Sequence, residues 1–141
     1  NGFFLDGFPR TVSQVEALEK FKKIDKVLNF VASDRVILLR LGGRRICRKC
    51  GATYHIKEIP PKIKGVCDIC GGKLYQRPDE TPQAIKNRLR VYREKTKPVL
   101  DYFRKQGLLA DIDANYPFEE IDKVISQCER QLQKLGADLR K

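Results

Sequence analysis

Hydrophobic residues gather in short runs along the chain, and the polar stretches between these runs carry an amphipathic spacing. Residues 2–6 are apolar up to a final carboxylate, which is typical of a strand buried on both faces of a parallel sheet. Residues 27–31 and 108–113 have the length and composition of two further strands. The intervening segments repeat apolar residues every three or four positions, as helices do. This alternation predicts an α/β fold built on a parallel sheet.

Capping signals place the helices. Thr11 with Gln14 resembles a capping box, in which both side chains accept hydrogen bonds from backbone N–H groups at the start of a helix. The starts of the other helices follow signals at Ser33, Thr81 with Pro82, and residues 115–117. Pro98 lies inside the helix that starts at Thr81 and is expected to break or kink it. The second helix is expected to end at Gly42-Gly43, and the last at Gly136.

Four cysteines form two pairs with the spacing of metal knuckles: Cys47 with Cys50, and Cys67 with Cys70. A glycine follows each pair at once and allows backbone amides to approach the thiolates closely. Two such turns complete a closed set of four sulfur ligands, which predicts a structural zinc site. Two disulfides or two redox motifs are the alternatives, and iron can occupy the same four thiolates. His55 lies between the knuckles and is a weaker ligand candidate than the cysteines.

Composition limits the class of protein. The 141 residues allow one ordinary domain, or one domain with a small metal module. The formal net charge of +11 predicts an anionic partner: nucleic acid, a phosphate-rich small molecule or an acidic surface. No apolar run reaches the length of a membrane span, and no signal-peptide pattern occurs. Cysteines suited to a thiolate site favour a reducing compartment.

Arginines surround the cysteine-bearing segment. Arg40, Arg44 and Arg45 precede it, and Arg77 and Arg88 follow it. Asp6 and Arg10 come at the end of the first predicted strand, where parallel sheets bind ligands. A planar guanidinium can bind two phosphate oxygens, so one hypothesis is a mobile cover over polyphosphate. On composition alone, a zinc ribbon that binds nucleic acid explains the charge equally well.

Several motifs, taken together and in this order, resemble adenylate kinase in its long form with a zinc-bearing lid. They are residues 2–11, Gly43-Arg44-Arg45, the four-cysteine segment, and the Arg-x-Asp-Glu-Thr run of 77–81. The resemblance implies a parallel sheet of the P-loop nucleoside monophosphate kinase type, incomplete here, with helices on both faces and a small zinc-ribbon-like lid insertion. It implies core parts at 1–43 and 80–141, and a lid at 44–79.

The resemblance also implies roles for individual residues. Catalysis is assigned to Asp6, Arg10, Arg44, Arg77 and Arg88. AMP binding is assigned to Gly7, Phe8, Pro9, Arg10, Gln14, Arg77 and Arg88. ATP binding is assigned to Arg40, Arg44, Thr53, Tyr54 and Tyr116. Zinc is assigned to Cys47, Cys50, Cys67 and Cys70, without contact to substrate. Magnesium is expected with ATP, held by Asp6 through water.

The implied reaction is in-line phosphoryl transfer, in which ATP and AMP give two ADP. The family resemblance further suggests a cytoplasmic monomer that binds ATP, AMP and ADP, with no nucleic-acid or membrane partner. The 141 residues contain no Gly-x-x-x-x-Gly-Lys-[Ser/Thr] motif. They resemble the carboxyl-terminal two-thirds of the enzyme, without its P-loop and AMP-binding helices, and we expect no useful turnover from them alone. The alternatives are a zinc-ribbon nucleic-acid binder and a kinase for another nucleoside monophosphate.

Overall fold

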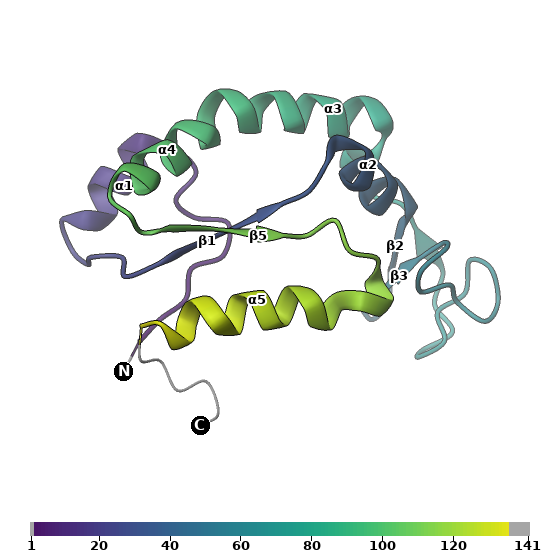
Figure 1. Ribbon diagram of the computed structural model, residues 1–141. Helices are drawn as coiled ribbons and strands as arrows, with labels where there is room; N and C mark the ends of the chain where they lie inside the picture. Colours follow the sequence, from purple (N-terminus) through teal and green to yellow (C-terminus); the bar gives the residue numbers. More distant parts are fainter. Residues whose placement is uncertain (1, 136–141) are drawn as a thin grey trace. The chain divides into compact units, whose positions relative to one another are not determined.

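The computed structural model describes residues 2–135 (Figure 1). The chain divides into two compact units. The first unit consists of Asn1–Val31, Arg90–Ala114 and Asp122–Lys141. The second consists of Ala32–Leu89 and Asn115–Ile121. Within residues 2–135, the helices are all too short or too polar to cross a lipid bilayer.

A two-stranded parallel sheet forms the centre of the first unit. Strand β1 (Val27–Val31) pairs with β5 (Leu109–Asp113), in register from Val27 opposite Leu109 to Val31 opposite Asp113. The side chains of β5 alternate, so that Ala110 and Ile112 are buried while Asp111 and Asp113 are exposed. Figure 1 shows α1 (Val12–Glu19) and α4 (Lys97–Lys105) on one side of this sheet and α5 (Ile121–Gln133) on the other. The predicted α/β fold with a parallel sheet is confirmed.

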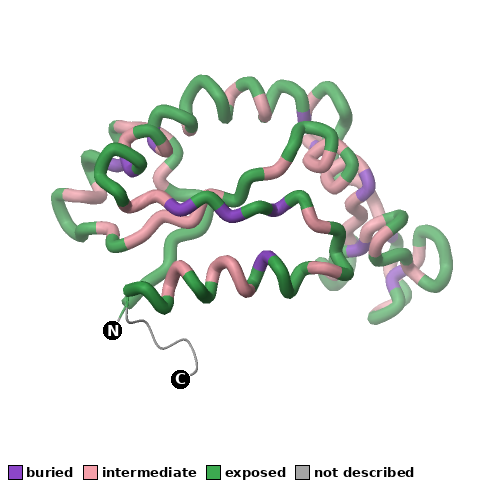
Figure 2. Tube along the Cα trace, in the orientation of Figure 1, coloured by how far each residue is buried: buried purple, intermediate pink, exposed green. Residues whose placement is uncertain are grey.

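The core of the first unit lies between the sheet and the pair α1 and α4. Val15 from α1 meets Val99 and Phe103 from α4, and all three side chains are buried. Figure 2 colours the trace by burial and shows buried positions in β5 and in the helices on either side of it. Full burial of side chains of this size stabilises the fold by about 1.5–3 kcal/mol each. The amphipathic spacing of the sequence therefore identifies the faces that pack.

A π turn interrupts the helix that follows Thr81. The segment runs as α3 (Pro82–Val91), a π turn (Tyr92–Thr96) and then α4, with Pro98 in the first turn of α4. Proline has no N–H to donate, and its ring displaces the carbonyl four residues earlier. The wider π turn accommodates this, as expected from the sequence.

The second unit joins a helix to a small antiparallel sheet. Ser33 caps α2 (Asp34–Gly43), its hydroxyl accepting from the N–H of Val36 at 3.3 Å. The sheet has the order β3-β2-β4, formed by β2 (Arg44–Cys47), β3 (Thr53–His55) and β4 (Leu74–Tyr75). Two short 3-10 turns, Pro78–Glu80 and Phe118–Glu120, complete the unit. The first cysteine pair lies at the end of β2, and the second lies in the connection between β3 and β4.

The structure differs from the sequence-based expectation at three places. Residues 2–6 form no strand: Phe4 is 80% exposed, and within residues 2–135 no strand pairs with this segment. Apolar character alone does not make a strand, because its backbone also needs a neighbour to hydrogen-bond. Strand β5 begins at Leu109, one residue later than predicted. Helix α5 ends at Gln133, and Gly136 lies outside the described residues.

Candidate functional site

The two cysteine knuckles share one backbone pattern. In the first, the N–H of Gly51 donates to the carbonyl of Cys47 at 3.0 Å, and the N–H of Cys47 donates to Ala52 at 2.9 Å. In the second, the N–H of Gly71 donates to Cys67 at 2.9 Å, and the N–H of Cys67 donates to Gly72 at 2.8 Å. Gly51 and Gly71 have φ of 76° and 68°, the left-handed region in which glycine is favoured. The glycines after each pair are therefore part of the turn itself.

The knuckles bring four sulfur atoms together. Cys47, Cys50, Cys67 and Cys70 are free thiols whose Sγ atoms all lie within 4.8 Å of one another. A Cβ on Gly72 would lie 2.9 Å from the Sγ of Cys47, so only glycine fits beside this cluster. Four converging thiols with backbone N–H groups directed at them can hold one metal ion.

Neighbouring groups shift the thiol pKa values in opposite directions. The hydroxyl of Tyr54, 3.4 Å from the Sγ of Cys67, is the main cause that lowers the pKa of Cys67 to about 6. The backbone N–H of Gly72 lowers the pKa of Cys70, but the other sulfurs and burial outweigh it and raise this pKa to about 12. Clustered thiols cannot all ionise together without a cation, so the protons belong to the cluster as a whole.

Tyr54 lies inside the segment rather than on its surface. Its side chain is buried with Cys47, Cys67 and Leu74, and its hydroxyl also accepts the N–H of Asp68 at 2.8 Å. The phenol therefore supports the cysteine cluster. Thr53, the other predicted ATP contact on β3, is exposed.

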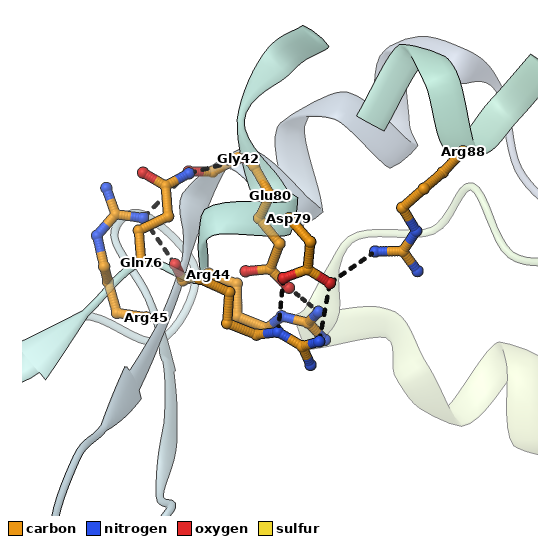
Figure 3. Close-up of polar contacts among 8 residues, drawn as sticks. Gly42, Arg44, Arg45, Gln76, Asp79, Glu80 and Arg88 are labelled. Carbon is orange, nitrogen blue, oxygen red and sulfur yellow. Dashed lines mark hydrogen bonds and ion pairs between the residues drawn. The ribbon is translucent and has the colours of Figure 1, made fainter. Parts of the chain in front are cut away.

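One glutamine connects the two ends of the cysteine-bearing segment. The side-chain N–H of Gln76 donates to the carbonyls of Gly42 at 3.1 Å and Glu80 at 2.9 Å. Arg45 also donates to Gly42, at 3.1 Å (Figure 3). Because Gly42 lies in the last turn of α2 and Glu80 follows β4, these bonds hold the start and finish of segment 44–79 beside each other.

Three arginines and two carboxylates meet at this junction. Arg44 pairs with Glu80, and Arg77 binds Asp79 through two N–H···O bonds of 2.8 Å each. Arg88 from α3 lies 4.0 Å from the same Asp79 carboxylate. Figure 3 shows the side chains of Arg44 and Arg88 directed toward the two carboxylates from opposite sides of the view. The structure thus brings together Arg44, Arg77 and Arg88, three of the residues that the sequence predicted to be catalytic.

Burial separates the two carboxylates. Glu80 is fully buried, whereas the side chains of Asp79, Arg77 and Arg88 are each about half exposed. The hydrogen bonds and charge of Arg77 hold the pKa of Asp79 below its ordinary value. Burial, followed by the charges of Arg77 and Arg88, lowers the pKa of Arg44. A guanidinium remains ionised throughout the physiological range, so Arg44 stays positively charged beside Glu80.

The Asp-Gly-Phe-Pro-Arg segment forms a turn within the first unit. Arg10 donates from Nε to the carbonyl of Gly7 at 2.6 Å, and a Cβ on Gly7 would lie 2.8 Å from the Arg10 guanidinium. Gly7 also has φ of 70°. The side chain of Gln14 accepts the N–H of Arg10 at 2.7 Å, while its own N–H is capped by Thr11. Asp6, Phe8 and Arg10 are exposed. These three residues, which the resemblance assigns to catalysis or AMP binding, are therefore accessible. Gln14 also holds the turn in place.

The remaining predicted ATP contacts meet at the end of α2. Arg40 donates from its guanidinium to the carbonyl of Tyr116. The neighbouring Asn115 side chain accepts the N–H of Ser33 at 2.8 Å, at the opposite end of the same helix. The loop after β5 is thus fixed to α2 by both bonds. Sequence reasoning missed Gln76, Asp79 and Glu80, although two of them lie in the Arg-x-Asp-Glu-Thr run that carries the resemblance.

Comparison with known proteins gives a consistent result. Residues 44–79 match the family model described as adenylate kinase, active site lid. The adenylate kinase of Methanocella arvoryzae is 50% identical over 140 residues, which cover 96% of this chain and 63% of that protein. Those of Caldicellulosiruptor saccharolyticus and Clostridioides difficile are 54% and 49% identical over 77% and 88% of this chain, and 53% and 58% of their own length. The chain thus spans between 53 and 63% of these relatives, in their carboxyl-terminal part.

Proposed function

The chain belongs to the adenylate kinase family, and from this premise we propose that the protein transfers a phosphoryl group between ATP and AMP to give two ADP. The observation that supports this most is the cluster of Arg44, Arg77 and Arg88 at the two ends of segment 44–79. Three guanidinium groups at a hinge can neutralise the charge of a transferred phosphoryl group. We take residues 44–79 as the lid, and residues 1–43 and 80–141 as core parts.

Each group in the proposed mechanism acts by position and charge. Arg10, Arg44, Arg77 and Arg88 bind the phosphates and spread the charge that develops in line between donor and acceptor. No covalent enzyme intermediate is needed. Closure of the lid excludes water, which otherwise competes with AMP as the acceptor. Magnesium is proposed to accompany ATP, with Asp6 holding it through water.

Nucleotide recognition follows from the exposed turn and the α2 junction. Gly7, Phe8, Pro9 and Gln14 are proposed to line the AMP side, where the amide of Gln14 can both donate to and accept from adenine. Arg40, Thr53, Tyr54 and Tyr116 are proposed for the ATP side. For Tyr54 the contact is through the backbone, because its ring is buried beside the cysteines.

Zinc is proposed as the metal of the four-cysteine cluster. Four thiolates within 4.8 Å suit zinc, and iron is the competing candidate. When bound, the metal supplies cross-linking of the small sheet, not chemistry on the substrate. Atomic emission from purified protein distinguishes the two metals, with one zinc per chain as the expected result.

The test of the reaction is direct. Full-length protein is incubated with MgATP and one of AMP, CMP, UMP or GMP, and phosphorus NMR follows the products. We expect phosphoryl transfer to AMP, which gives ADP, and none to CMP, UMP or GMP. Transfer to another monophosphate at a comparable rate would identify the alternative kinase. No transfer, together with steeply salt-dependent binding of RNA or DNA, would identify the zinc-ribbon alternative. The 141 residues contain no P-loop motif, and for this reason we predict that they lack useful turnover by themselves. Cytoplasmic location and a monomeric state are further parts of the proposal.

A further inference from the structure

We propose that Asp79 and Glu80 have two different tasks at the arginine cluster: Asp79 is a counter-ion that phosphate displaces, and Glu80 is a permanent positioning residue for Arg44. The inference rests on the proposed function, because it assumes that the phosphates of a nucleotide reach this cluster. The two carboxylates are neighbours in the chain and touch the same group of arginines, so only their surroundings can give them different tasks.

Glu80 is not exchangeable because water and phosphate cannot reach it. Its side chain has no exposed surface, and its backbone is fixed by Gln76, which donates to its carbonyl, and by the carbonyl of Arg77, which accepts its N–H. It pairs with a guanidinium that is about one-third exposed. The Nε of Arg44 and the second carboxylate oxygen of Glu80 are buried without a hydrogen-bond partner. Arg44 is thus held through one N–H group and keeps other donors for a ligand.

Asp79 occupies the position that suits a phosphate. It receives two parallel N–H···O bonds from Arg77 and faces Arg88 at 4.0 Å, which is the fork geometry that guanidinium groups offer to phosphate oxygens. All three side chains are about half exposed. Exposed ion pairs contribute little net stability, so a dianionic phosphoryl group can replace the single charge of Asp79 at small cost.

The charge count shows what the two carboxylates contribute before a nucleotide binds. Three guanidinium groups face two carboxylates, which leaves one net positive charge instead of three. Burial is the main cause that lowers the pKa of Arg44, and the positive charges of Arg77 and Arg88 lower this pKa further. The carboxylates reduce the repulsion between the arginines. A bound phosphate then replaces the charge of Asp79, which is the exposed one of the two carboxylates.

The two tasks predict opposite effects of removing one charge. Asp79→Asn removes the competitor of phosphate and should tighten binding of tripolyphosphate about two- to fivefold. Glu80→Gln keeps the shape but releases Arg44, and should weaken the same binding about tenfold. Glu80→Asp, which keeps the charge, should recover part of that loss. Asp101→Asn is the matched control, because Asp101 also forms an exposed pair, with Arg104, and lies in the other unit. It should leave the binding unchanged.

Isothermal titration of full-length wild-type and variant proteins with tripolyphosphate measures these effects. Opposite shifts for Asp79→Asn and Glu80→Gln support the proposal. Equal shifts, shifts like that of Asp101→Asn, or no saturable binding by the wild-type protein would overturn it. If Glu80→Gln is too unstable to purify, Asp79→Asn decides alone, because its exposed pair is not needed for folding. Wild-type protein that binds tripolyphosphate but transfers no phosphoryl group to AMP would instead refute the proposed function and leave this exchange standing.

Discussion

Adding one methyl group to each of two neighbouring glycines is predicted to have opposite effects on stability. Gly42 and Gly43 are the last residues of α2, where the chain enters the lid. A Cβ on Gly42 meets nothing within 4 Å, whereas a Cβ on Gly43 would lie 2.0 Å from Nε2 of His55. Neither glycine has a positive φ. The two positions therefore share backbone conformation and differ only in the space beside them.

The magnitude follows from what His55 must give up. Its Nε2 lies 3.1 Å from the carbonyl of Leu39, and its Nδ1 accepts the N–H groups of Lys57 at 3.3 Å and Glu58 at 3.1 Å. Displacing the ring breaks these bonds, each with a net contribution of about 1 kcal/mol. Alanine regains up to about 1 kcal/mol through its better helix propensity. Gly43→Ala should therefore destabilise by about 2 kcal/mol, and Gly42→Ala should stabilise by about 0.5–1 kcal/mol.

Thermal unfolding followed by circular dichroism measures both effects. For a chain of this size, 1 kcal/mol corresponds to roughly 4 °C in Tm, so Gly43→Ala should lower Tm by about 8 °C. His55→Ala provides the control, because in that background the methyl group of Gly43→Ala has room. The double-mutant cycle should then show strong coupling between residues 43 and 55. Equal Tm changes for the two glycine variants, or additive effects of Gly43→Ala and His55→Ala, would refute this account of the hinge.

Three further predictions concern the lid. Binding of one zinc ion at about pH 8 should release fewer than four protons, measured with an indicator dye. The pKa of Cys67 is about 6, so this thiol is already ionised before the metal binds. Release of four protons would contradict this prediction. In the metal-free protein, the same lowered pKa contributes stability that is complete above the ordinary pKa of a thiol and is lost as the pH falls through about 6. Urea should therefore unfold the metal-free lid more readily at about pH 5 than at about pH 8. Tyr54→Phe should lower zinc affinity about tenfold in a chelator competition, because it removes the hydroxyl beside Cys67, whereas Tyr75→Phe, which changes a tyrosine on β4 of the same sheet, should leave the affinity unchanged.

The features that local chemistry determines could be predicted from the sequence. Ser33 caps its helix as expected, the helix is interrupted just before Pro98, and the residues of β1 are those predicted. The cysteine cluster was also predictable, because the spacing within each pair and the glycine after it determine the turn. In each case the signal lies within a few neighbouring residues, which is the range over which sequence patterns are informative.

The remaining features depend on contacts between distant residues. Nothing near Glu80 in the sequence indicates that it is fully buried against Arg44, a residue 36 positions earlier. The sequence does not indicate that Tyr54 lies beside Cys67, 13 positions later, and only the fold places it there. Residues 2–6 show the reverse case: their apolar pattern predicted a strand, but strand formation depends on a hydrogen-bonding neighbour that a local pattern cannot supply.

The position of bound phosphate tests the central claim most directly. A crystal structure of the full-length protein with MgADP should show phosphate oxygens bound by Arg44, Arg77 and Arg88, with Asp79 turned away and Glu80 still paired with Arg44. A nucleotide bound with its phosphates away from all three arginines, while the Asp79 pairs stay intact, would contradict both the proposed catalytic roles and the exchange of Asp79 for phosphate.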